Sequence, residues 1–130
     1  IRIMSFTNFL ETEILDHVFA GASYTAPGTH YLALFTAIAN GETGSVTELS
    51  GSAYARQSVA FTTSGDTTSN NAAVEFPTAT GSWGTVTHVG VYDASTSGNL
   101  MAYATLSSSK AIDTGDVFRV PSGDLDITLN

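Results

Sequence analysis

The chain contains no cysteine among its 130 residues. This absence excludes disulfide bonds and metal sites built on thiolates. Long apolar runs are missing as well: no stretch approaches the ~20 consecutive apolar residues that a membrane-spanning helix needs. The first residues lack the basic-then-apolar order of a secretory signal. We therefore expect neither a membrane span nor a signal peptide.

Basic residues are also scarce. Four of them, Arg2, Arg56, Lys110 and Arg119, stand against twelve acidic residues and give a net charge of −8. Proteins that bind nucleic acid draw most of their affinity from cations that neutralise phosphates, and an anionic membrane surface likewise attracts clustered cations. The sequence predicts no nucleic-acid partner and no membrane partner.

Groups that could perform chemistry do not cluster along the sequence. The candidates are His17, His30, His88 and the acidic pairs Asp113/Asp116 and Asp124/Asp126. The three histidines fall in separate segments and no two of them have a metal-ligand spacing. Each acidic pair suits a turn or a solvated strand face better than a calcium site or a glycosidase couple. We expect no catalytic residue, no metal and no cofactor, and hence no enzyme.

The stretch from residue 84 to residue 106 is the centre of the predicted fold. Val86–Tyr92 and Leu100–Leu106 are rich in β-branched, aromatic and aliphatic residues, and the segment Ala-Ser-Thr-Ser-Gly-Asn between them is typical of a turn. Both runs carry apolar residues on both faces, and simple alternation puts Leu100 on the same face as Ala102. Such a hairpin belongs inside a sheet that a second sheet or a helix covers.

Residues 5–20 show the four-residue spacing of an amphipathic helix, which Gly21 is placed to end. The apolar stripe consists of Phe6, Phe9, Leu10, Ile14, Leu15 and Val18. This stripe either covers the sheet of its own chain or docks on a neighbouring subunit, and we favour a contact that includes a neighbour. The candidate interface residues are Phe6, Phe9, Leu10, Ile14 and Val18.

With the central hairpin included, the chain after the helix reads as seven or eight short strands at a spacing of about 8 to 12 residues. We predict a mainly β protein: an antiparallel β-sandwich, jelly-roll-like, with one N-terminal amphipathic helix. The expected organisation is a single domain over residues 1–130, with an extension at 1–4, the helix at 5–20 and the sandwich at 30–129.

Aromatic residues allow one alternative to a purely structural role. Trp83 stands close to two glycines, and with Tyr24, Tyr54 and Tyr103 it could form a platform that stacks on sugars. Aromatic residues in such positions also serve as core or interface packing. Trp83 and Tyr54 are the candidate contacts to a ligand or a host surface.

Short motifs spread along the chain together resemble one protein family. They are Met4-Ser-Phe-Thr-Asn-Phe-Leu-Glu11, Leu15-Asp-His17, Tyr24-Thr-Ala-Pro27, Tyr31-Leu-Ala-Leu-Phe-Thr36, Tyr54-Ala-Arg-Gln57, Phe76-Pro-Thr-Ala79, Gly84-Thr-Val-Thr-His-Val-Gly90, Asp93, Gly98-Asn-Leu100, Gly115-Asp116 and Gly123-Asp-Leu-Asp-Ile-Thr-Leu129. The chain resembles small virion proteins of tailed bacteriophages, which are often labelled tail fibre proteins and which we interpret as head decoration or cement-type proteins. The similarity runs from Met4 to the end. Ile1 to Ile3 lie outside it, and Met4 resembles a natural start.

The resemblance implies a non-enzymatic component on the surface of the phage particle. Its partners would be further copies of itself, as a dimer or trimer, and the major capsid protein or other virion proteins. Our preferred function is a capsid decoration protein, whose many copies bridge capsid subunits and stabilise the head through summed weak contacts. The alternatives are a tail-fibre or baseplate-associated module that contacts the host surface, and a carbohydrate-binding β-sandwich.

Overall fold

A six-stranded antiparallel sheet forms the larger layer of the molecule. The computed structural model describes residues 4–129. The strand order is β1 (Ser5–Phe6), β9 (Leu100–Ile112), β8 (Gly84–Tyr92), β2 (His30–Asn40) and β3 (Ser45–Glu48), and β4 (Gln57–Val59) also pairs with β2. A short 3-10 helix, η1 (Gly41–Thr43), joins β2 to β3. The predicted hairpin is confirmed as the pair β8 and β9 in the middle of this sheet.

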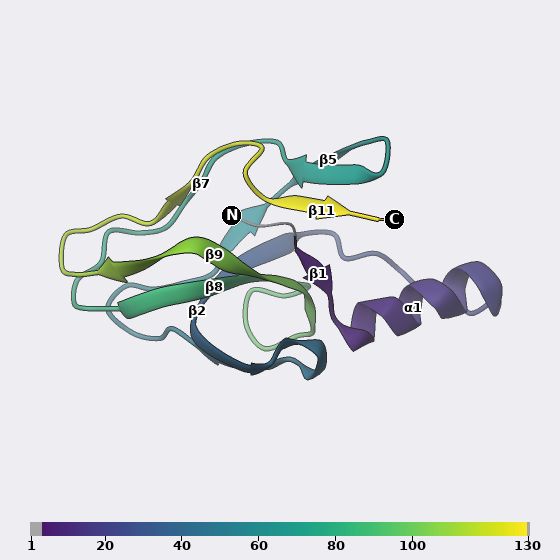
Figure 1. Cartoon of the computed structure of the whole chain (residues 1–130), viewed down its shortest axis with the longest axis horizontal. Helices are drawn as coiled ribbons and strands as arrows, with labels where there is room; N and C mark the ends of the chain where they lie inside the picture. Colours follow the sequence, from purple (N-terminus) through teal and green to yellow (C-terminus); the bar gives the residue numbers. More distant parts are fainter. Residues whose placement is uncertain (1–3, 130) are drawn as a thin grey trace.

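Two smaller sheets cover one face of the larger one (Figure 1). The first contains β5 (Phe61–Ser64), β6 (Thr67–Asn70) and β11 (Asp126–Thr128), and the second contains β7 (Val74–Glu75) and β10 (Arg119–Val120). Leu34, Val86 and Val89 of the large sheet are fully buried against Phe76 and Leu125 of the covering layer. The structure confirms a mainly β, antiparallel, sandwich-like architecture with one helix. The jelly-roll description stays a prediction.

The opposite face of the large sheet carries a smaller apolar cluster of Ala33, Phe35, Tyr92 and Leu100. The position of Leu100 corrects the simple alternation, which placed it beside Ala102. Val91 pairs with Ala102, while Tyr92 pairs with Leu100. Strand β9 therefore has one extra residue at this point, a β-bulge, and its side chains change face there.

The helix α1 (Asn8–Phe19) is shorter than predicted. Thr7 is its N-cap and accepts a hydrogen bond from the backbone N–H of Leu10, while Ser5 and Phe6 pair with β9 as strand β1. The predicted helix at 5–20 therefore begins three residues too early. Met4, assigned to an extension at 1–4, is 3% exposed and belongs to the core, and Ile1 to Ile3 lie outside the described residues.

The helix leaves the body of the molecule instead of lying on a sheet. Figure 1 shows α1 projecting from one end, on the side where the β5–β6 turn also points outward. Within residues 4–129, no helix has both the length and the apolar character needed to cross a bilayer.

Candidate interaction surface

The last two turns of α1 carry three apolar side chains in water. Leu15 is 57% exposed, Val18 is 60% exposed and Phe19 is 82% exposed. Residues three and four positions apart lie on the same side of a helix, so these three side chains form one ridge. Leu10, in the first turns, is buried instead. The helix thus uses its start to pack on the body and leaves its end uncovered.

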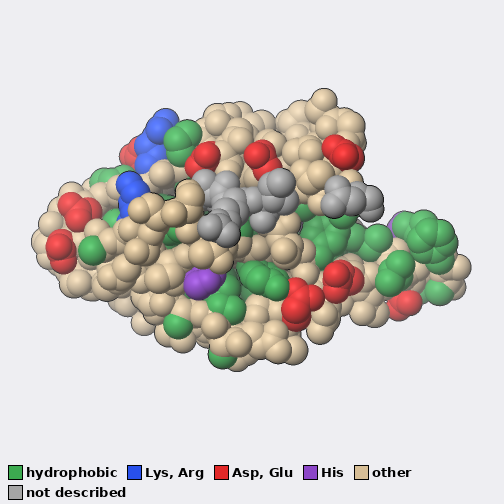
Figure 2. Space-filling model, in the orientation of Figure 1, with side chains coloured by type: hydrophobic (Ala, Val, Ile, Leu, Met, Phe, Trp, Pro, Cys, Tyr) green, Lys and Arg blue, Asp and Glu red, His purple; other side chains and the backbone are tan. Residues whose placement is uncertain are grey.

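The residue that follows strand β11 adds a fourth exposed side chain at this end of the molecule. Leu129 is 56% exposed and shares a surface hollow with Phe6 and Glu11 at the start of α1. Of the five large hydrophobic side chains that are exposed within residues 4–129, only Val117 lies elsewhere, in the loop before β10. We call Leu15, Val18, Phe19 and Leu129 the apolar end. Figure 2 shows hydrophobic side chains gathered on α1 and on the part of the body next to it.

An apolar pocket lies at the foot of α1, between the large sheet and the three-stranded sheet. Its volume is about 250 Å³, and its walls include Phe6, Leu10, His30, Phe61, Thr68 and Ile127. We call it the foot pocket. Burial lowers the pKa of His30, and the Asp93 carboxylate partly opposes this shift. The imidazole packs edge-on against Phe61 with 6.1 Å between ring centroids, so His30 serves here as a largely apolar wall.

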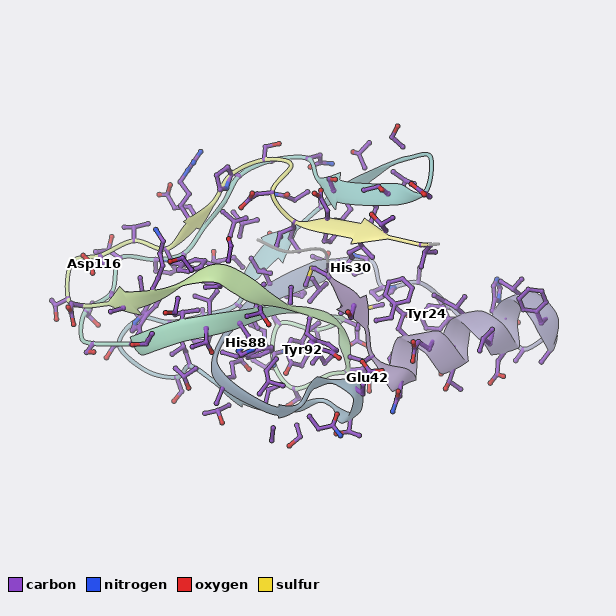
Figure 3. The ribbon with its side chains drawn as sticks, in the orientation of Figure 1. Tyr24, His30, Glu42, His88, Tyr92 and Asp116 are labelled. Carbon is purple, nitrogen blue, oxygen red and sulfur yellow. The ribbon has the colours of Figure 1, made fainter. Side chains whose placement is uncertain are left out.

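Specific hydrogen bonds fix the direction in which α1 projects. The Thr7 hydroxyl donates to the carbonyl oxygen of Leu100 at 2.6 Å, and the Thr7 backbone N–H donates to the carbonyl oxygen of Met101 at 2.9 Å. Beyond the helix, the backbone N–H of Tyr24 donates to His17 Nδ1 at 3.2 Å, which ties the returning chain to α1. Figure 3 shows Tyr24 beside the helix. The apolar ridge is therefore carried by a helix that is anchored at its start and braced near its end.

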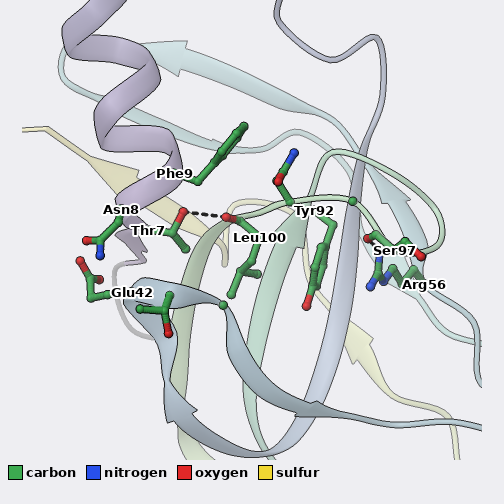
Figure 4. Close-up of a pocket in the computed structure, with 12 residues that line it drawn as sticks. Thr7, Asn8, Phe9, Glu42, Arg56, Tyr92, Ser97 and Leu100 are labelled. Atoms are coloured by element: carbon green, nitrogen blue, oxygen red, sulfur yellow. Dashed lines mark hydrogen bonds between the residues drawn. The ribbon is translucent and has the colours of Figure 1, made fainter.

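A second, polar pocket of about 480 Å³ lies on the other side of the helix start (Figure 4). One of its two charged side chains, Glu42, accepts a hydrogen bond from the Tyr103 hydroxyl at 2.5 Å. This bond raises the pKa of Tyr103 to about 12. The Glu42 carboxylate is thus engaged within the fold.

Arg56 is the other charged side chain of the polar pocket. It donates two hydrogen bonds to the Glu48 carboxylate, at 2.9 and 2.8 Å, and two more to the carbonyl oxygens of Ala94 and Ser97, at 2.9 and 2.7 Å. Its guanidinium also lies 3.6 Å from the centre of the Tyr92 ring. Arg56 therefore holds the β8–β9 loop to the body, and it makes four hydrogen bonds within the chain.

The structure distributes the five predicted interface residues unevenly. Leu10 is buried, Phe6 belongs to strand β1 and packs against the core, and Phe9 lines the polar pocket. Ile14 is half-buried and Val18 is exposed. The sequence interpretation did not include the two exposed residues Leu15 and Phe19 in the interface. Leu15 already widened the apolar stripe, and extending that stripe past Val18 would have found Phe19.

Trp83 corrects the expectation of an aromatic platform at the surface. It is 5% exposed, and its indole Nε1 donates to the carbonyl oxygen of Ser52 at 2.9 Å. Tyr54 packs against Trp83 and Phe76, and its hydroxyl donates to Glu48 at 2.6 Å. Burial and the bond to Glu48 raise the pKa of Tyr54 far above its usual value. Trp83 belongs to the core, and the half-buried Tyr54 packs against it.

The titratable residues that were candidates for chemistry form hydrogen bonds within the fold. The backbone N–H of Asp113 donates to the Asp116 carboxylate at 2.9 Å, which closes a turn at the end of the molecule opposite Tyr24 (Figure 3). His88 Nδ1 and the Thr87 hydroxyl are 2.7 Å apart. Within residues 4–129, no group of three or more His, Asp or Glu side chains is arranged to hold a metal ion.

Fold and surface together define a class: a small antiparallel β-protein whose distinctive feature is a projecting helix with exposed apolar side chains. The family described as Podophage GP4 fiber I protein gp80 matches residues 5–128, and the chain belongs to this family. The resemblance to small tailed-phage virion proteins is thereby confirmed, and the protein has a structural role in the phage particle. Comparison with curated proteins found no match.

Proposed function

We propose that this protein is an assembly subunit of the phage fibre, which acts by joining protein chains and not by catalysis. The observation that carries this proposal is the apolar end, where four of the five large exposed hydrophobic side chains within residues 4–129 gather. Membership of a fibre protein family supports placing that contact in the fibre.

The physical reason is the cost of leaving this surface in water. Three apolar side chains on α1 and Leu129 beside it leave on the order of 300 Å² of apolar surface exposed, which is within the range of the largest patch on a typical monomer. The largest apolar patch on a monomer is often functional. Here the remaining surface is acidic and rich in hydroxyl groups, so the apolar end is the natural place for a lasting contact.

A decoration protein on the outer shell of the head is the second candidate. The observation that favours it is the shape: residues 4–129 form a compact body with a single short helix and no long shaft. In this role the apolar end would anchor each copy to the major capsid protein or to a sister copy. Many weak contacts would then add up to a stabilised head.

A role in binding sugars on the host surface is not proposed. That hypothesis depended on an exposed Trp83 and Tyr54, and both rings are packed against the core. A host-contacting fibre would need another surface.

Quantitative mass spectrometry of purified particles, combined with immunogold labelling, tests the proposal. A fibre subunit predicts a small number of copies and label on the tail. A decoration protein predicts hundreds of copies and label over the head. Absence of the chain from purified particles would contradict both candidates.

A further inference from the structure

We infer that the end of α1 docks in a groove of a different virion protein, and that this groove has an apolar floor and a rim that carries Lys or Arg. The inference rests on the proposed assembly function and names the chemistry of the partner. The observations that carry it are the exposed ridge of Leu15, Val18 and Phe19 and the two carboxylates that lie beside that ridge.

The spacing of the ridge is that of a helix that binds in a groove. Val18 and Phe19 follow Leu15 by three and four residues, so the three exposed side chains lie along one side of α1. Amphipathic helices that bind in hydrophobic grooves present their anchor residues at this spacing. Residues 15–23 are all exposed. A groove can therefore receive the end of α1 without displacing another described segment of the chain.

The end of α1 is already ordered before it meets a partner. The Thr7 hydroxyl donates to the carbonyl oxygen of Leu100 at 2.6 Å, and the backbone N–H of Tyr24 donates to His17 Nδ1 at 3.2 Å. The helix projects from the body between these two attachments (Figure 1). A preformed ridge loses little conformational entropy when it docks. The end of α1 can thus act as a fixed ligand.

Two carboxylates give the ridge an acidic edge. Glu11 precedes Leu15 by four residues and Asp16 precedes Phe19 by three, so each carboxylate lies about one turn from an anchor residue. Both acidic residues are exposed, and Glu11 also shares the surface hollow with Leu129. Charges that face each other across an interface are arranged to be complementary. The rim that meets this edge should therefore carry Lys or Arg.

The chain does not offer such a rim to a second copy of itself. Of its three cations within residues 4–129, Arg56 is bonded inside the fold, while Lys110 and Arg119 lie on β9 and β10. Figure 2 shows the Lys and Arg side chains of the visible face at the end opposite α1. Two copies that met through α1 would bring Glu11 and Asp16 close to their own counterparts, and such like-charge contacts are unfavourable. The charge pattern therefore favours a different protein as the partner.

This pairing predicts how the contact responds to salt. Salt screens the attraction between the acidic edge and a basic rim, and it leaves the apolar contact in place. The chain should therefore leave the particle more readily as the ionic strength rises. A contact made by apolar groups alone would hold at high salt.

The test measures the number of copies of the chain on purified phage particles after washes of increasing salt concentration, by quantitative mass spectrometry. Phages that encode Phe19→Ser should carry at least tenfold fewer copies, because this change removes the most exposed anchor residue without altering the charge. Val117→Ser is the matched control, since it changes an exposed apolar residue outside the apolar end. It should leave the copy number unchanged.

Asp16→Lys tests the acidic edge separately and should reduce the copy number at least threefold. Asp113→Lys makes the same change of charge in an exposed turn at the end of the molecule opposite α1, and it should have no effect. A lysine near the C-terminus of a helix favours the helix, so Asp16→Lys should remain folded. Circular dichroism of each purified variant establishes that it is folded.

Three results would overturn the inference: a copy number that does not fall as salt rises, equal copy numbers for Asp16→Lys and Asp113→Lys, or equal copy numbers for Phe19→Ser and Val117→Ser. A photo-crosslink from position 19 to a second copy, or to a protein segment without Lys or Arg, would overturn it as well. In each of these cases the particle still contains the chain, so the assembly function stands. If particles lack the unmodified chain, the assembly function itself fails.

Discussion

At the scale of single residues, the charged groups that looked dispersed in the sequence stabilise the fold. The pair of Arg56 and Glu48 is the clearest example, with side chains 7% and 24% exposed and an N–O distance of 2.8 Å. Removing one partner of a buried pair leaves the other without compensation. Arg56 also donates to two loop carbonyls, so its loss should loosen the loop between β8 and β9.

We therefore expect Arg56→Ala to lower the free energy of unfolding by about 3 kcal/mol. Urea denaturation measures this change. Arg119→Ala is the control, because the ion pair of Arg119 with Glu75 is long at 3.8 Å and more than half exposed on both sides. It should cost less than about 1 kcal/mol. Equal losses in the two variants would show that Arg56 has no special structural role.

His30 supplies a prediction about pH. Burial holds its pKa in the folded protein below the value near 6.5 that it has in the unfolded chain. As the pH falls through this region, the unfolded chain takes up a proton more readily, so unfolding becomes easier. The contribution of His30 to stability is complete above about pH 6.5 and is lost as the pH falls below that value.

Urea denaturation at pH 7.5 and pH 5.5 should show a loss of stability that is smaller in His30→Gln than in the unmodified chain. Most carboxylates titrate below this range, and His17 and His88 are common to both proteins, so the comparison isolates His30. Identical losses in both proteins would contradict the assignment.

At the scale of elements, strand β8 has no room for a side chain at position 90. A Cβ atom on Gly90 would lie 2.6 Å from atoms of both Phe35 and Leu100. Gly90→Ala should therefore destabilise the protein by about 1 to 3 kcal/mol through overpacking. Gly28→Ala, in an open loop with nothing within 4 Å, is the matched control and should have little effect. Thermal unfolding of the two variants gives the comparison, and equal stabilities would refute the packing argument.

The sequence predicted the elements that have a local signal, but not those held by distant backbone partners. The helix follows from its apolar spacing, and the pair β8 and β9 follows from two runs of β-branched, aromatic and aliphatic residues around a turn. Residues 63–71 are a polar run without apolar alternation, and they nevertheless contribute to the hairpin of β5 and β6. Asn70 explains why: it is 2% exposed, and its side chain bonds the backbone of Ala72, Pro121 and Leu125. No local pattern shows contacts with residues some fifty positions away.

The apolar end was also predicted only in part, because its exposure depends on contacts between residues far apart in the sequence. The sequence indicated that α1 has an apolar stripe, but which part of the stripe is free depends on where the helix leaves the body. Leu10 and Phe6 are used inside the chain because β1 pins the helix start to β9, so exposure shifts toward Leu15, Val18 and Phe19. Trp83 shows the same limit, since its burial depends on a loop thirty residues away.

At the scale of the whole molecule, the protein combines a polar, acidic body with one apolar end. The body keeps the chain dispersed, because a net charge of −8 makes incidental contacts between copies unfavourable. Under the proposed function, the apolar end concentrates association at one place. This division suits a virion subunit, which must remain separate until it assembles and must then hold its position.

The most direct test of this account is photo-crosslinking in the phage particle itself. A chain with a photo-reactive residue in place of Phe19 is incorporated into particles, irradiated and analysed by mass spectrometry, with the same substitution at Val117 as the control. We predict an adduct between this chain and a neighbouring protein chain of the particle through position 19 and none through position 117. Incorporation without any adduct at position 19 would contradict the claim that the protein works through the end of α1.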